Sequence, residues 1–119
     1  MVDDYLGTKA LQHVANAELS VDITIISDNK GNSPLRLTEY NDFLTEYPGR
    51  VIRFVSSAGK THDRYVVLDY GTSSMKVYHC GASSKDAGNR ITTITRLNDI
   101  DGYEAMMSSL LSNPVLNLK

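Results

Sequence analysis

The sequence predicts a single α/β domain in which a mixed β-sheet is flanked by helices on both faces. Helical and strand patterns alternate in the first half of the chain, four strand-like segments crowd into residues 51–97, and a helical pattern follows them. With 119 residues, 41% of them hydrophobic and 22% charged, the chain has the size and composition of one globular domain. We therefore expect one core and one sheet.

The first half is predicted to form a helix, a strand, a loop and a second helix. Thr8 is a candidate cap for a helix with apolar residues at helical spacing, and the β-rich segment 21–26 follows it. Turn-forming residues fill the segment 27–34. A helix capped by Thr38 then repeats apolar and aromatic residues at i, i+3, i+4 and i+7 until Pro48 and Gly49 stop it.

The second half is predicted to form four strands and a last helix. The strands cover residues 51–55, 64–69, 75–80 and 91–97, and the turn at 69–74 should join the second and third of these as a hairpin. Asp101, with Glu104 three residues later, resembles the start of a capped helix. We expect the apolar face of this helix to be core, not a partner groove: Tyr103, Met106, Met107, Leu110 and Leu111.

The cysteine content and the apolar runs indicate a cytoplasmic chain without a membrane segment. The lone Cys80 cannot form a disulfide within the chain, and no secretory leader is apparent. The longest apolar runs are far shorter than the roughly 18 residues that cross a bilayer. His79 and Cys80 are neighbours on a strand and should point to opposite faces, so we expect no metal site and no cofactor.

The charge is unevenly distributed along the chain. A net charge of −2 argues against strong nonspecific attraction to nucleic acid. However, residues 1–49 contain three basic and eight acidic side chains, whereas residues 50–98 contain eight basic and three acidic ones. The basic middle segment suits an anionic substrate, and an ordinary solvated surface would explain it equally well.

One group of residues is typical of phosphate chemistry. His62 and Arg64 are two apart where a strand begins, so their side chains should project from the same face. An imidazole can act as nucleophile or base, and a guanidinium can hold a phosphate through two parallel hydrogen bonds. The loop at 81–88 adds the hydroxyls of Ser83 and Ser84 and the ammonium of Lys85, which can bind an oxyanion.

The pattern His62-x-Arg64-x4-Asp69, followed by Gly81-Ala82-Ser83, resembles the histidine, lysine and aspartate motif of the phospholipase D-like superfamily. It also resembles the single-motif domains found at the ends of bacterial and mobile-element proteins. The spacing matches, but Arg64 stands where the family has lysine, and residues 81–86 only approximate the family's glycine-serine-x-asparagine segment. The resemblance covers most of residues 1–119, as one half-domain that lacks its first strand.

The resemblance implies a metal-independent phosphodiester transfer in a homodimer. One histidine attacks phosphorus and a second protonates the leaving oxygen, so a chain with one motif needs a second copy related by a two-fold axis. His62 would then be nucleophile or acid, and Arg64 would clamp the phosphate. Asp69 would either belong to the catalytic set or hold a turn, and Asp86 would orient the imidazole.

Two further functions remain open beside a nuclease that acts on DNA or RNA. One is a non-catalytic module of the same fold that binds nucleic acid or a protein partner. The other is a structural dimerisation domain. Outside the motif, we expect Asp3 and Asp4 to act as caps or turn residues. Asp28 should do the same, or else Asp28 or Asn29 borders the pocket where a strand ends.

Overall fold

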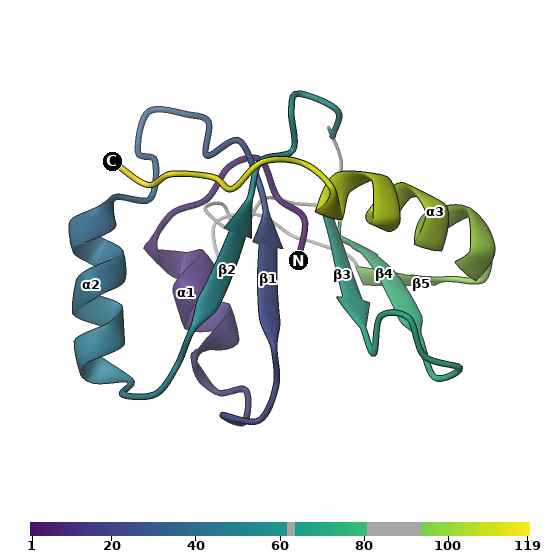
Figure 1. Ribbon diagram of the computed structural model, residues 1–119, viewed down its shortest axis with the longest axis horizontal. Coiled ribbons are helices and arrows are strands. Elements are labelled where there is room, and N and C mark those ends of the chain that lie inside the picture. The colour runs from purple at the N-terminus through teal and green to yellow at the C-terminus, as the bar shows by residue number, and fades with distance from the viewer. Residues whose placement is uncertain (62–63, 81–93) are drawn as a thin grey trace.

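The computed structural model describes residues 1–61, 64–80 and 94–119 (Figure 1). Helix and strand alternate in the first half, and consecutive strands and a last helix make up the second. None of the helices in these ranges is long and apolar enough to span a membrane. Each helix and strand expected from the sequence is present in these ranges, with small differences in the bounds, and residues 91–93 of the last expected strand lie outside the described residues. The elements are α1 (Thr8–Ala15), β1 (Ile23–Ile26), α2 (Leu37–Glu46), β2 (Ile52–Val55), β3 (Arg64–Leu68), β4 (Lys76–Cys80), β5 (Ile94–Leu97) and α3 (Ile100–Leu111).

The helix caps differ from the expected ones. The residues that precede the three helices are Gly7, Arg36 and Asp99, where the sequence pattern indicated Thr8, Thr38 and Asp101. At α3 the Asp99 carboxylate accepts a hydrogen bond of 3.2 Å from the Gly102 N–H. A Cβ atom at position 102 would lie only 2.7 Å from Asp99 Oδ2, so the missing side chain of Gly102 allows this close approach.

The strands form two small sheets. β1 and β2 are parallel, with Ile26 opposite Val55. β3, β4 and β5 are antiparallel, and Arg64 lies opposite Cys80. The expected hairpin between β3 and β4 is confirmed.

Val2 joins the two sheets. It forms a parallel bridge with Ile26 and an antiparallel bridge with Tyr65. Its N–H donates to the Tyr65 carbonyl at 2.8 Å, and the Tyr65 N–H donates back at 3.1 Å. The expected single mixed sheet is thus confirmed only in part, because its two halves are linked by one residue. The sequence pattern predicts no strand at this position.

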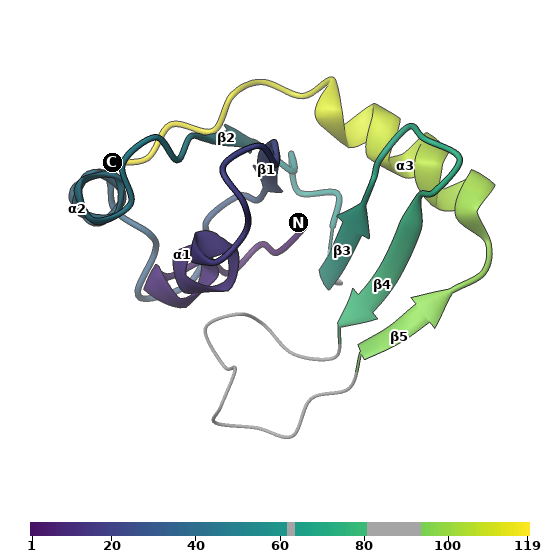
Figure 2. The same cartoon turned by 90° about the horizontal axis from the view of Figure 1, so that it is seen from below.

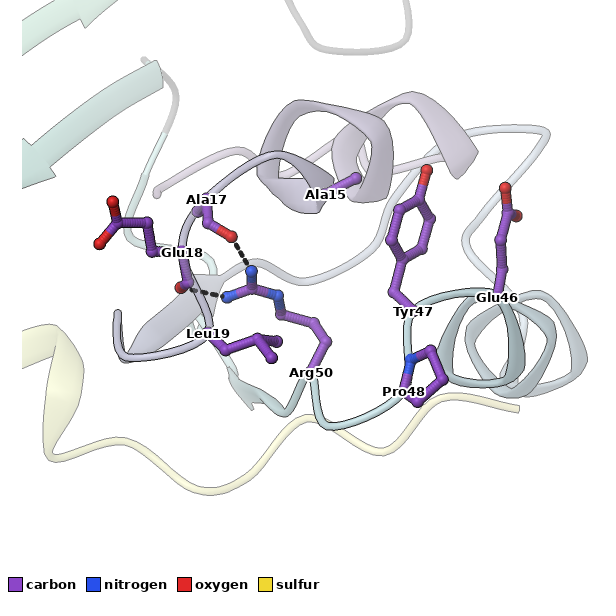
Figure 3. Close-up of a pocket in the computed structure, with 8 residues that line it drawn as sticks. All are labelled: Ala15, Ala17, Glu18, Leu19, Glu46, Tyr47, Pro48 and Arg50. Carbon is purple, nitrogen blue, oxygen red and sulfur yellow. Dashed lines mark hydrogen bonds between the residues drawn. The ribbon is translucent and has the colours of Figure 1, made fainter.

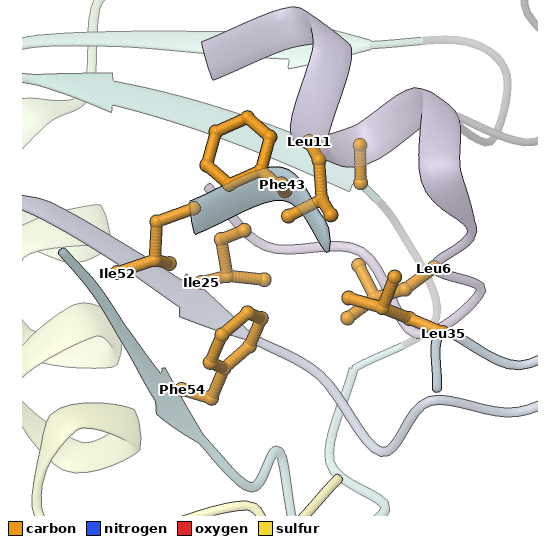
Figure 4. Close-up of a cluster of buried hydrophobic side chains, with 8 residues drawn as sticks. Leu6, Leu11, Ile25, Leu35, Phe43, Ile52 and Phe54 are labelled. Atoms are coloured by element: carbon orange, nitrogen blue, oxygen red, sulfur yellow. The ribbon is translucent and has the colours of Figure 1, made fainter. Parts of the chain in front are cut away.

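The helices cover both faces of the β1–β2 pair. Ile25 and Ile26 are neighbours on β1 and contribute to different clusters of buried side chains. Figure 4 shows the first cluster, built from α1, α2 and the strands: Leu6, Ala10, Leu11, Ile25, Leu35, Phe43, Ile52 and Phe54. The second cluster contains Val2, Ile26, Val55, Met107 and Leu110. The last two come from α3, which confirms that its apolar face belongs to the core.

The C-terminal segment runs along the outer edge of β2 (Figures 1 and 2). The Ser56 N–H donates to the Pro114 carbonyl at 2.9 Å, and the Leu116 N–H donates to the Phe54 carbonyl at 3.1 Å. These bonds satisfy backbone groups that an uncovered edge strand would expose. One edge of the β1–β2 pair is therefore covered by this segment and the other by Val2.

Candidate functional site

Polar side chains gather at the edge of the sheet where the parallel strands end. Asp3 and Asp4 follow Val2, Ser27 and Asp28 follow β1, and the loop that begins with Ser56 follows β2. Asp3, Asp4 and Ser27 are buried, as is Ser57 in the loop. Because the carboxyl ends of parallel strands share one edge, these groups lie together despite their separation in sequence.

Asp4 links the loops that follow β1 and β2. Its Oδ1 atom accepts hydrogen bonds from the Ser57 hydroxyl at 2.6 Å and from the Asp28 N–H at 3.1 Å. Its Oδ2 atom lies 3.3 Å from Lys30 Nζ. With both oxygens occupied, this buried carboxylate has a structural role.

Asp28 fixes the loop after β2. Its Oδ1 atom accepts hydrogen bonds from the Ser56 hydroxyl and from the N–H groups of Ser57 and Ala58, at 2.8, 3.0 and 3.1 Å, while Oδ2 accepts from Gly59 at 2.6 Å. Ala58 is held at φ 53°, in the left-handed region. Partial burial acts to raise the pKa of Asp28, but these four hydrogen bonds outweigh it and lower the pKa below the ordinary 3.8.

Replacing Asp28 with asparagine is expected to destabilise the fold by about 2 kcal/mol, because the new amide would face the Gly59 N–H with a donor. The folded-state pKa of Asp28 is lowered, so its stabilising effect is complete above pH 3.8 and is lost as the pH falls through the folded-state pKa. Urea unfolding at neutral and at acidic pH measures this, and the difference between the two proteins should shrink in acid.

The matched control is Asp42→Asn, at an exposed position of α2. It should change the unfolding free energy by less than about 0.5 kcal/mol. If Asp28→Asn behaves like this control at neutral pH, the carboxylate does not hold the loop.

Arg64 lies at the same edge, because β3 runs antiparallel to the Val2 segment and begins where β1 and β2 end. Its Nε atom is 3.5 Å from Asp3 Oδ1. The Arg64 side chain is 22% exposed and that of Asp3 only 2%. Nε itself is buried without a hydrogen bond to any residue in the described ranges. The Tyr5 N–H donates to Asp3 Oδ1 at 3.0 Å and fixes that carboxylate.

Cys80 is the cross-strand partner of Arg64, so the chain leaves β4 toward residue 81 at the strand end next to the guanidinium. Burial is the main reason that the pKa of the Cys80 thiol is raised above 9.0, and the nearby Asp3 adds to it, against a smaller opposing effect of Arg64. The thiol is therefore protonated at neutral pH and is a weak nucleophile.

The structure separates Arg64 from Asp69. Asp69 follows the other end of β3, at φ 53°, and its carbonyl accepts hydrogen bonds from the N–H and hydroxyl of Thr72. At about 3.3 Å per residue, the two positions are roughly 16 Å apart along the strand. Asp69 thus takes part in the turn between β3 and β4, and a catalytic role for it stays a prediction.

The other expected site residues, which are His62, Ser83, Ser84, Lys85 and Asp86, lie outside the described residues. Asn29 holds a loop, because its side chain exchanges two hydrogen bonds of 2.8 Å with the backbone of Leu35. Asp28 also holds a loop, but the loop is the distant one after β2 and not its own turn. The turn role expected of Asp3 is confirmed, since its carboxylate accepts from the Tyr5 N–H two residues later. Asp3 and Asp4 are also buried and paired with distant cations, which no local sequence signal indicates.

A pocket lies at the opposite end of the sheet, between the ends of α1 and α2 (Figure 3). The guanidinium of the buried Arg50 crosses it and donates to the carbonyls of Ala17 and Glu18. These bonds tie the segment after α1 to the start of β2, which is a structural role. In the part of the chain that the structure describes, no group of three or more histidine, cysteine or acidic residues could hold a metal ion.

A comparison of the chain with protein-family models gives no match. Comparisons with curated proteins and with solved structures give none either. The motif and the geometry of the sheet edge are therefore the observations that bear on function.

Proposed function

We propose that the chain is a metal-independent phosphodiesterase, and specifically a nuclease acting on DNA or RNA in the cytoplasm. In this proposal it corresponds to one half of a phospholipase D-like enzyme and works as a homodimer. His62 is the nucleophile and Arg64 binds the phosphate. Ser83, Ser84 and Lys85 complete the phosphate site.

The pairing of Arg64 with Cys80 is the observation that carries the proposal. His62 comes two residues before Arg64, and the segment with Ser83, Ser84 and Lys85 follows directly after Cys80. Because Arg64 and Cys80 are paired at one end of the sheet, the residues connected to them can share one phosphate site. The edge where three parallel segments end is also where α/β sheets commonly bind ligands.

The chemistry requires two histidines. A neutral His62 nitrogen attacks phosphorus and forms a P–N bond, while the P–O bond to the leaving group breaks and the partner subunit's His62 donates a proton to that oxygen. Water then attacks phosphorus and forms a new P–O bond, while the P–N bond breaks and releases His62, and the same partner histidine takes up the proton of the water. Arg64 and Lys85 offset the negative charge on the phosphoryl oxygens, and Asp86 orients the imidazole.

Hydrolysis of DNA, RNA and a chromogenic phosphodiester in excess chelator tests this proposal. The wild-type chain should cleave at least one of them, and His62→Ala should reduce the rate at least about 10³-fold because the covalent route is lost. His13→Ala, at an exposed position of α1, is the control and should keep most of the activity. Absence of any His62-dependent cleavage would end the enzyme proposal.

One observation favours a second function, a non-catalytic module that binds nucleic acid or a protein partner. Arg64 already has an ionic partner in Asp3, and it replaces the more point-like lysine of the family motif. Such a module would bind saturably without turnover, and Arg64→Ala together with Lys85→Ala would abolish binding. Turnover that depends on His62 would exclude this alternative.

A further inference from the structure

The geometry points to Asp3 as a positioning residue, which holds Arg64 by its Nε edge so that the two Nη atoms face the phosphate. This inference rests on the proposed function, because it assigns a role toward the same phosphate. It concerns a residue outside the motif, near the start of the chain and 61 positions before Arg64.

The burial of the two side chains supports this arrangement. Arg64 Nε has essentially no solvent exposure, yet the side chain as a whole is 22% exposed, so its exposed surface lies on other atoms. Asp3 Oδ1 is 3.5 Å from Nε, close enough for ionic attraction. The recorded contact is thus an ion pair at the Nε edge of the guanidinium, without a hydrogen bond from Nε.

Asp3 is itself held in place. Its backbone N–H donates to the Ile26 carbonyl at 3.1 Å, and its Oδ1 atom accepts from the Tyr5 N–H at 3.0 Å. Val2, directly before it, is bridged on both sides. Because backbone bonds fix the carboxylate on the rigid part of the sheet, it can fix the orientation of the guanidinium.

The chemistry of the guanidinium explains why this arrangement needs arginine. Arginine presents its donors on separate edges of a plane, so one edge can face a carboxylate while another binds a phosphate. A lysine at position 64 would have a single nitrogen, for which Asp3 and the phosphate would compete. Asp3 should therefore favour phosphate binding when residue 64 is arginine and oppose it when residue 64 is lysine.

A double-mutant cycle with inorganic phosphate as the probe tests this inference. In the Arg64 chain, Asp3→Asn should weaken phosphate binding about tenfold, since the guanidinium loses its anchor. In the Arg64→Lys chain, the same substitution should strengthen binding. If Asp3 acted on phosphate only through its negative charge, Asp3→Asn would strengthen phosphate binding in both chains. If Asp3 only stabilised the fold, the substitution would weaken binding in both. Either result overturns the inference. Asp4→Asn is the control and should show no change of sign.

NMR of the arginine side chains separates failure of this inference from failure of the proposed function. In the wild-type chain, the Arg64 Nε–H should exchange slowly with solvent, and phosphate should shift the Nη signals more than the Nε signal. This measurement needs no variant and stays decisive if Asp3→Asn does not fold. If phosphate binds but the Arg64 Nε–H exchanges rapidly, the role of Asp3 is overturned and the proposed function is not. No phosphate binding and no cleavage overturn the proposed function, and the phosphate role of Asp3 with it.

Discussion

Val2→Asp is expected to destabilise the fold by at least about 3.5–5 kcal/mol. Val2 is 0% exposed, bridges β1 and β3, and packs in the second core cluster with Met107 of α3. The substitution removes about 1.5–3 kcal/mol of apolar burial and adds at least about 2 kcal/mol for a polar group buried without a partner. Since net stabilities of domains are about 5–15 kcal/mol, this is between about a quarter and all of the stability. Circular dichroism during urea unfolding measures this.

The control is the same substitution at an exposed valine. Val21 precedes β1 and is 48% exposed, so Val21→Asp should change the unfolding free energy by less than about 1 kcal/mol. Two variants with equal stability would mean that Val2 does not join the two sheets.

Arg64→Ala is expected to reduce phosphodiester turnover about 10²–10³-fold, the usual effect of removing one donor that stabilises charge in a transition state. The variant also leaves the buried Asp3 without its cation, so thermal unfolding should be measured beside the rate. Arg53→Ala, at an exposed position of β2, removes the same charge away from the motif. It should keep most of the activity. Equal loss in both variants would point to general attraction of a polyanion and not to a phosphate site at Arg64.

The sequence predicts the order and type of the elements because each carries its own periodicity. The aromatic and apolar spacing of α2 and the strand patterns of β3 and β4 are local signals, and the structure agrees with them. The link through Val2 could not be predicted in this way, since a single bridging residue has no period. The expected caps at α1 and α2 are wrong because neither helix begins with a threonine cap. Gly7 precedes α1 and has no side chain, and at α2 the Glu39 carboxylate accepts from the Arg36 N–H. At α3 the capping aspartate is Asp99, two residues before the expected one.

The site was predictable to a smaller extent. The order of the strands implies that Arg64 and the end of β4 meet, and the register agrees. The motif also contains Asp69, but β3 lies between Arg64 and Asp69, so the two residues are at opposite ends of the strand. Asp3 is predicted to be a turn residue, and its bond to the Tyr5 N–H confirms this, but only the pairing of the first residues with β1 and β3 brings it to Arg64. Contacts of this kind join distant parts of the chain and leave no local signal.

The most direct test of the central claim is to trap the covalent intermediate. Wild-type protein mixed with a phosphodiester, quenched in alkali and digested, should give a phosphorylated peptide that contains His62, because phosphohistidine survives alkali and is lost in acid. The adduct should be absent from His62→Ala and unaffected by chelator. Cleavage without any adduct on His62, or an adduct that forms only with added metal, would contradict the account.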